Sequence, residues 1–482
     1  MPEPRVTERR DPVYEERVTM IRTQLFTRTA LGFALAAGLV VTSVPALAAP
    51  KPPAAPKLAL SKPFQTLAAP LDAEIKNAKT RPDVVAAKAQ ADAASNAYNQ
   101  AQGTAARNAA KAQRDAAIVA LGATVAGEKA RLDAAFAAAT TQDDKYTAGT
   151  MAVSLGGLAM DTALQRRGLQ AMIDSGKPTP ADAARFNFFI GSIAYDARDY
   201  AGARSALTAA TTGGYHENDA DALLADAYLQ DNQVAQGLTI LQQAINARKA
   251  AGAQAPANWF RRGLGAAYKA RLLDQAAAFS MGLVENYPTT ENWSGAITVV
   301  RELAKYPAQE TLDLMRLMDR TKSFNEERDY IEYIQAADAR RLPGEVQRIL
   351  DAGLAAGKLR ANDVFVSESK TTAAARITAD RASLAGLERD ASAAGATAAT
   401  AMAAGDAFLS YADATKAERF YTAALTKPGV DTPRVLTRLG IAQYDLGKYA
   451  EAQATFAKVT GPRMALAKLW GIQSAAKAKP AA

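Results

Sequence analysis

Cysteine is absent from this chain of 482 residues, and His216 is the single histidine. Without cysteine there can be no thiolate catalysis, no disulfide bond and no cysteine-based zinc or iron–sulfur site. One histidine also argues against a histidine-dependent catalytic triad, and its surroundings, GGYHENDA, predict a solvated turn. P-loop, HExxH, GxSxG and EF-hand patterns are missing too. We therefore expect no enzyme activity, no catalytic residue, no cofactor and no metal site.

Aromatic residues are also scarce, at 7% of the chain, although hydrophobic residues make up 49% of it. Much of this share is alanine, which loses no side-chain entropy in a helix and lets helices pack closely. The composition therefore predicts an all-α protein. The formal net charge is +8, but Lys and Arg alternate with Asp and Glu along most of the sequence. This mixture predicts a solvated surface, and we expect no nucleic acid partner.

The segment from Met20 to Pro50 has the three parts of a secretory signal peptide. Arg22 and Arg28 supply the positive start, Ala30 to Val44 forms an apolar core of 15 residues, and Ala46-Leu47-Ala48 matches an A-x-A cleavage site. The alternative is a membrane anchor, which needs about 20 apolar residues and no A-x-A site. We predict a Sec signal peptide (residues 20–48) that is cleaved after Ala48.

Residues 1–19 do not fit the start of a signal peptide, because they carry four Arg against five acidic residues. We expect translation to begin at Met20, so that residues 1–19 are a mis-assigned extension. The remaining chain has no second apolar run of spanning length. We predict a mature protein without a transmembrane segment, in the bacterial periplasm or outside the cell.

The first part of the mature chain is poor in large apolar residues. Residues 49–80 are rich in Pro, Ala and Lys and predict an extended linker. Residues 81–140 are rich in Ala, with interruptions at Gly103 and Gly122, and predict a pair of long helices that pack through alanine. Disorder of low-complexity sequence is the alternative for this region.

Larger residues recur with a fixed period farther along the chain. Two units begin at Ile190-Gly191 and, 34 residues later, at Leu224-Ala225; two others are marked by Ala404-Gly405 and, 35 residues later, Leu439-Gly440. A further copy fits at Leu264-Gly265, which follows the second after 40 residues and places Tyr268 in its apolar seam. In each unit a small residue follows twelve positions after the Gly or Ala, and a larger residue sixteen positions after it.

These residues resemble the tetratricopeptide repeat (TPR) family, whose 34-residue helix-turn-helix unit has Leu-Gly at positions 7 and 8 and small residues at 20 and 27. The resemblance implies a right-handed α-solenoid. It covers residues 150–288 as TPR-like repeats and 401–482 as a C-terminal repeat pair with a capping helix. Residues 289–400 are expected to form degenerate helical repeats, with DVFVSESK (363–370) as a linker.

Close packing explains the small residues of the unit. We expect position 8 to face position 20 where the two helices cross, so that bulk at either position separates them. Positions 7, 11, 24 and 27 are expected to form the apolar seam. Ala452→Leu should then lower the melting temperature by several degrees.

The resemblance also implies a concave groove lined by the first helix of each unit. The candidates for binding a peptide there are Arg185, Phe188, Tyr195, Trp259, Arg262, Lys269, Arg434 and Tyr444. Aromatic rings among cations suit an extended peptide or an acidic chain terminus. The alternative is that these side chains only contact a neighbouring helix or a bound terminal helix.

The sequence thus leads to a hypothesis about the functional class of the protein. We expect a non-enzymatic scaffold that binds a protein or peptide partner in the bacterial cell envelope. One alternative is an accessory module of peptidoglycan or polysaccharide machinery that holds glycan in the groove. Another is binding of an anionic polymer through the Lys, Pro and Ala-rich tails.

Overall fold

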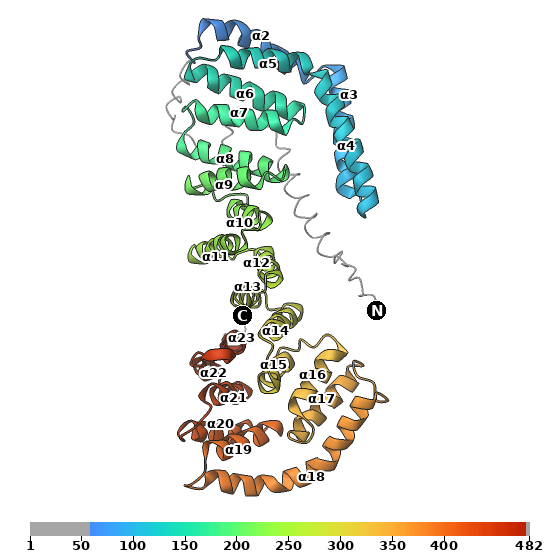
Figure 1. Cartoon of the computed structure of the whole chain (residues 1–482), viewed down its shortest axis with the longest axis vertical. Helices are drawn as coiled ribbons and strands as arrows, with labels where there is room; N and C mark the ends of the chain where they lie inside the picture. Colours follow the sequence, from blue (N-terminus) through green and yellow to red (C-terminus); the bar gives the residue numbers. More distant parts are fainter. Residues whose placement is uncertain (1–57, 479–482) are drawn as a thin grey trace, which may run out of the picture. The chain divides into compact units, whose positions relative to one another are not determined.

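The computed structural model describes residues 58–478, so residues 1–19, the signal peptide and the first part of the linker lie outside the described residues. Residues 58–478 form 22 α-helices and no strand (Figure 1). The predicted all-α class is confirmed. The chain divides into two compact units, which we describe separately: unit 1 ends at Asp231 and unit 2 begins at Asn232.

Unit 1 is a succession of helices in which neighbours along the chain pack on one another, α6 on α7, α8 on α9 and α9 on α10. Helix α2 also packs on α5 and α6. The helices are α2 (Lys62–Ala78), α3 (Pro82–Gln100), α4 (Thr104–Thr124), α5 (Ala126–Ala138), α6 (Gln142–Leu158), α7 (Thr162–Asp174), α8 (Pro180–Asp196), α9 (Tyr200–Thr212) and α10 (Ala220–Gln230).

The predicted linker (residues 49–80) extends too far, because its residues 62–78 form helix α2. Phe64, Leu71 and Ile75 repeat at helical spacing and are buried in the core of unit 1. The turn before α2 is fixed by Asp144, which accepts hydrogen bonds from the Ser61 amide at 2.9 Å and the Ser61 hydroxyl at 2.7 Å. A helical apolar face therefore outweighs the Pro and Lys content of this segment.

The alanine-rich region forms three helices, α3 to α5, where the sequence predicted two. Gly103 separates α3 from α4 with φ at +80°, a conformation that glycine adopts without strain. Gly122 lies inside α4 and does not interrupt it. Helices α3 and α4 pack on each other along their length, although few of their residues are buried.

Unit 2 also stacks neighbouring helices, and its last helix returns to the first ones. Helix α23 packs on α22 and on α13, α14 and α15. The helices are α11 (Val234–Ala250), α12 (Ala257–Lys269), α13 (Leu273–Asn286), α14 (Thr290–Ala304), α15 (Ala308–Arg320), α16 (Glu327–Ala337), α17 (Pro343–Ala355), α18 (Val364–Ser392), α19 (Ala398–Ser410), α20 (Ala414–Leu425), α21 (Thr432–Asp445), α22 (Tyr449–Phe456), the short 3₁₀ helix η1 (Gly461–Arg463) and α23 (Met464–Ala478).

The repeated helix pairs predicted from the sequence are confirmed, and their crossing follows one rule. A Cβ atom added to Gly191, Gly405 or Gly440 would lie 2.6 Å from a side-chain atom of the residue sixteen positions later. These later residues are Leu207, Tyr421 and Phe456. The small residue at position 8 is therefore covered by the large one at position 24, where we expected the small one at position 20.

The predicted register of the third copy is wrong. Gly263 lies under the ring of Phe279, again sixteen positions later, where an added Cβ would be 2.4 Å from the ring. The crossing is thus two residues before the predicted Gly265, and Tyr268 is 38% exposed outside the seam. Several small residues stand side by side here, so the sequence offered more than one register.

The turns inside the helix pairs share a backbone conformation. The residue two positions before the second helix has a positive φ in six turns: Met160, Arg198, Asn232, Arg271, Ala412 and Gly447. In the pair of α21 and α22, the Lys448 amide donates to the carbonyl of Gln443 at 2.9 Å, which closes the first helix with a Schellman-type bond.

Helix α18 replaces the predicted linker at 363–370. Asp363 caps it by accepting a hydrogen bond from the Val366 amide at 3.1 Å. The helix then continues without a break to Ser392. It packs on α17 with its first part and on α19 with its last part. Among residues 58–478 no helix is both long and apolar enough to cross a membrane.

Candidate binding groove

The candidate groove residues of unit 1 lie on α8, but they do not form one open surface. Phe188 is 2% exposed and packs against Phe189 and Tyr215. Arg185 is exposed and forms an ion pair with Asp182. The Tyr195 hydroxyl donates a hydrogen bond to Asp226 of α10. The ring of Phe188 is therefore part of the core, while Arg185 remains at the surface.

The candidate residues on α12 are also unevenly exposed. Trp259 is 2% exposed, and the guanidinium of Arg248 lies 4.8 Å from the centre of its ring. Arg262 is half-buried and Lys269 is exposed. The aromatic member of this set is thus covered by the chain itself. Binding of a peptide by these residues stays a prediction.

The candidates on α21 contact helices of their own unit. The Arg434 guanidinium donates a hydrogen bond to Gln309 of α15 at 2.7 Å. Tyr444 packs edge-on against Trp470 of α23, and its hydroxyl accepts a hydrogen bond from Gln473 at 3.0 Å. The neighbouring side chains of Thr437 and Ile441 are fully buried. This wall of the expected groove is occupied by α15 and α23.

A buried ionic cluster joins α15 to α17, α19, α21 and η1. Asp313 has no exposed surface and accepts hydrogen bonds from Arg316 at 2.9 Å, Arg438 at 3.2 Å and Arg463 at 2.7 Å. Burial alone would raise the pKa of Asp313, but these three cations outweigh it and hold the pKa at about 2. Its carbonyl oxygen also accepts the Trp470 indole N–H at 2.9 Å.

Glu345 and Asp406 complete this cluster. Arg316 binds both oxygens of Glu345, at 2.8 and 2.7 Å, and the hydroxyl of Tyr333 donates to the same carboxylate at 2.6 Å. Burial raises the pKa of Glu345, but the charge of Arg316 lowers it further, to about 2. Asp406 accepts from Arg438 at 2.6 Å and from the Tyr421 hydroxyl at 2.8 Å. Each buried charge therefore has a partner inside unit 2.

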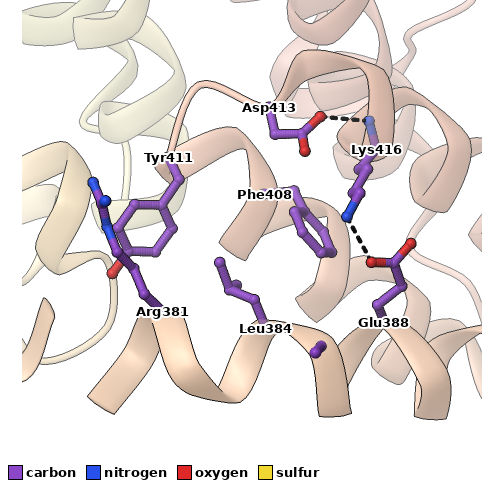
Figure 2. A pocket seen from close by; sticks show the side chains of 8 residues that line it. Arg381, Leu384, Glu388, Phe408, Tyr411, Asp413 and Lys416 are labelled. Carbon is purple, nitrogen blue, oxygen red and sulfur yellow. Dashed lines mark hydrogen bonds and ion pairs between the residues drawn. The ribbon is translucent and has the colours of Figure 1, made fainter. Parts of the chain in front are cut away.

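One open hollow of unit 2 lies between α18 and the pair α19 and α20 (Figure 2). We call it the α18 groove; its volume is about 470 Å³. Helix α18 contributes Arg381, Leu384, Ala385 and Glu388, and the facing side contributes Phe408, Tyr411, Asp413 and Lys416. In Figure 2 the side chain of Leu384 points from α18 toward the space between Tyr411 and Phe408. The half-buried Leu384 is thus the apolar floor of the groove, Phe408 lies beneath it in the core, and charged groups form the rim.

The rim is organised by two cation–ring pairs. The guanidinium of Arg381 lies 5.1 Å from the ring centre of Tyr411, and the ammonium of Lys416 lies 4.8 Å from that of Phe408. Lys416 also forms an ion pair with Glu388 at 2.6 Å. These contacts fix the directions of both cations, and Glu388 balances the charge of Lys416.

The titrating groups of the α18 groove are not poised for proton transfer at neutral pH. Burial, together with the hydrogen bond that Tyr411 donates to Asp380 at 2.7 Å, raises the pKa of the Tyr411 phenol. Hydrogen bonds from Lys416 and Arg419 lower the pKa of Glu388. One group therefore keeps its proton and the other stays ionised, which favours binding over acid–base chemistry.

Acidic and histidine side chains outside the α18 groove have structural surroundings. Within residues 58–478, no group of three or more acidic or histidine side chains is placed to hold a metal ion. His216 is exposed in the loop between α9 and α10, with its Nδ1 atom 2.9 Å from Asp221. Asp144 forms a capping box with Thr141 at the start of α6.

Most residues of the α18 groove were missed in the sequence. Phe408 was placed in the seam of a repeat, but Arg381 and Leu384 fell in a stretch without a clear apolar period. The signal that could have found them is Asp363, a good N-cap residue followed by a long run without proline. That run predicts a long helix, and such a helix must face the pair that follows it.

Comparisons with known proteins do not extend these observations. No family model and no curated protein matches the sequence. Among solved structures, the chain is similar to one described as "Crystal structure of APC/C hetero-tetramer Cut9-Hcn1", with 12% identity and a TM-score of 0.23. The match covers 67% of this chain and 66% of that chain, just under two thirds of its length. At this TM-score the likeness carries no argument, so the fold rests on the helix pairing described above.

Proposed function

We propose that this TPR-like protein is a scaffold of the bacterial cell envelope that binds a protein partner through the α18 groove. The observation that carries the proposal is the groove itself, an open hollow of about 470 Å³ with the half-buried Leu384 in its floor and charged groups at its rim. Sites for ligands commonly have this size and this arrangement of apolar and polar groups. A peptide segment with an apolar side chain would fill the floor and bond to the rim.

The occupation of the inner wall by the chain itself supports this choice of site. Arg434 and Tyr444 are bound to α15 and α23, and the ionic cluster around Asp313 closes the space between them. A partner would have to displace several charge-assisted hydrogen bonds to enter there. The α18 groove requires no such displacement.

Export to the periplasm or the medium is part of the proposal. It is supported by the positive start, apolar core and A-x-A site between Met20 and Ala48. The expected mature protein begins with Ala49-Pro50-Lys51. Expression of the full gene in a bacterium, followed by fractionation and N-terminal sequencing, tests this part. An intact N-terminus in the cytoplasm would rule out export by this signal.

Binding is tested by selecting peptides from a displayed random library on the immobilised full chain. Leu384→Asp places a charge on the floor of the groove and should abolish capture of the selected peptides. Val364→Asp is the matched control, because Val364 is 70% exposed on the same helix, twenty residues earlier. We expect this variant to bind like the parent.

The fold of each variant is checked by thermal melting, and Leu384→Ala serves as a milder variant that keeps an apolar surface. This variant should weaken binding, with a melting curve close to that of the parent. Capture of the same peptides by the parent and by folded Leu384→Asp would show that the α18 groove is not the binding site.

A further inference from the structure

Four exposed arginines surround the junction of α17, α18 and α19, next to the α18 groove. They are Arg340 and Arg341 in the loop before α17, and Arg376 and Arg381 on α18. We call them the arginine patch. Arg376 reaches the loop directly, since its Nη1 atom donates to the carbonyl of Arg340 at 3.2 Å. The patch therefore belongs to one surface, although its members are up to 41 positions apart in the sequence.

The contacts of Tyr411 connect the patch to the groove. Its ring lies against Gly344, where an added Cβ would be 2.5 Å from the ring, and Gly344 follows the loop of Arg340 and Arg341 after two residues. The same ring carries the guanidinium of Arg381 at 5.1 Å. Arg381 thus belongs both to the patch and to the lining of the groove.

The arginine patch gathers four arginines without an ion pair on one surface; Arg261 and Arg271, elsewhere in unit 2, also form none within the described residues. Among the described residues, none of its four side chains forms an ion pair, while Arg316, Arg320 and Arg438 each bind carboxylates. The paired arginines lie at the buried cluster or beside it. The acidic residues close to the patch, Asp338 and Asp380, accept hydrogen bonds from neutral donors and form no ion pair with its arginines. Asp338 accepts the amide N–H of Arg340 at 3.0 Å, and Asp380 accepts the Tyr411 hydroxyl at 2.7 Å.

We propose that the partner segment of the α18 groove is acidic, with carboxylates that bind the arginine patch and an apolar side chain that enters the groove. The inference rests on the proposed function and names the chemistry of its partner. Guanidinium groups bind carboxylates in a bidentate manner, and a surface with four arginines beside Asp338 and Asp380 keeps a net positive charge that attracts an acidic chain. The half-buried Leu384 beside the patch favours a peptide, because it can receive an apolar side chain while the arginines bind carboxylates.

The test uses a fluorescein-labelled peptide with one half of Glu and Asp and one half containing Leu and Phe. The matched peptide has Gln and Asn in place of the acids. Fluorescence anisotropy with the full chain at low and moderate salt measures both Kd values. We expect the acidic peptide to bind at least about tenfold more tightly, with a preference that shrinks as salt screens the charges.

The variants separate the patch from the net charge of the protein. Arg340→Gln, Arg341→Gln and Arg376→Gln combined should remove the preference for the acidic peptide. Arg198→Gln, Arg261→Gln and Arg271→Gln combined change the net charge equally, and these arginines are exposed without an ion pair in the described residues. This control should leave both Kd values within about twofold of the parent. Melting curves check that both triple variants fold like the parent.

Each other outcome overturns one part. If both peptides bind equally and Leu384→Asp abolishes both, the acidic partner is wrong and the proposed function stands. If Leu384→Asp folds and changes neither, the proposed function fails as well. Tighter, patch-dependent binding of an oligothymidylate or of phosphatidylglycerol vesicles than of the acidic peptide would assign the patch to an anionic polymer or a membrane.

Discussion

Two clusters of unit 2 combine arginines, carboxylates and tyrosines, and they differ in their exposure to solvent. In the buried cluster, Asp313 is fully enclosed and bonded to three arginines, and Glu345 is bonded to Arg316 and Tyr333. At the α18 groove, Glu388 binds Lys416 and Arg419 while 27% of its side chain is exposed. The residue types are alike, but only the second cluster keeps surface for a ligand.

The difference teaches that residue type alone does not identify a site in such a repeat. The wall that family resemblance designates for binding carries Arg434 and Tyr444, yet α15 and α23 cover both of them. Inside the protein each charge must be paired because desolvation is costly. A cation without a partner persists only where water or a ligand solvates it, and that is the condition of the arginine patch.

The largest effect is expected for Asp313→Ala. The change leaves Arg316, Arg438 and Arg463 in the interior with one carboxylate fewer, and the loss of one partner of a buried ionic group costs about 3–5 kcal/mol. For a unit of this size this corresponds to roughly 10 °C or more in the melting temperature. Differential scanning calorimetry of the full chain measures the effect. A loss under about 1 kcal/mol would place the buried cluster in the class of surface ion pairs.

A second effect concerns acid. The ordinary pKa values of Asp313 and Glu345 are 3.8 and 4.5, and both fall to about 2 in the folded protein. Since the folded state binds fewer protons, the stability from these groups is complete above about pH 4.5 and is lost as the pH falls toward about 2. Each shift corresponds to about 2 to 3 kcal/mol.

Urea denaturation of the parent and of Asp313→Asn between pH 5 and 2 isolates this effect. The amide does not titrate, so the stability gap between the two proteins should narrow by about 2 kcal/mol over this range. The comparison therefore reports on one group among many acidic residues. A gap that stays constant would mean that folding does not shift the pKa of Asp313, and a gap that widens would mean that folding raises it.

A smaller effect separates the two tyrosine hydroxyls. Tyr333→Phe removes the buried hydrogen bond to Glu345 and should cost about 1.5 to 2 kcal/mol. Tyr411→Phe removes the bond to Asp380 at a half-buried position, where water replaces the donor, and should cost less than about 1 kcal/mol. If urea denaturation gave equal losses of unfolding free energy for the two variants, the hydroxyls of the two clusters would not differ in exposure to solvent as we infer.

The fold was largely predictable, because repeat packing uses local spacing. Gly405 and Gly440 stand sixteen residues before Tyr421 and Phe456, and this arrangement is legible in the sequence. The third copy failed because Gly263 and Gly265 both suit a helix crossing, and only contact with Phe279 distinguishes them. A register with several small residues in a row is set by tertiary packing.

The sites were far less predictable. Asp313 and Arg438 meet across 125 positions of the sequence, and neither belongs to a motif. Helix α18 buries only Val366, Ala373 and Ala391, so it lacks the apolar stripe by which helices are recognised. The residues of α18 that line the groove can be identified only once the helix is placed opposite α19 and α20.

The smallest effect on stability, and the most informative one on binding, is expected for Glu388→Gln. The ion pairs of Glu388 with Lys416 and Arg419 are solvated, so the melting temperature should stay within about 1 °C of that of the parent. The change frees Lys416 at the rim of the α18 groove and Arg419 outside its lining, and the acidic peptide should therefore bind more tightly at low salt. Glu418→Gln is the control, because Glu418 pairs only with Lys448 outside the groove. Weaker binding by Glu388→Gln would mean that Glu388 orients Lys416 for the ligand, and that the groove needs its own carboxylate as much as its cations.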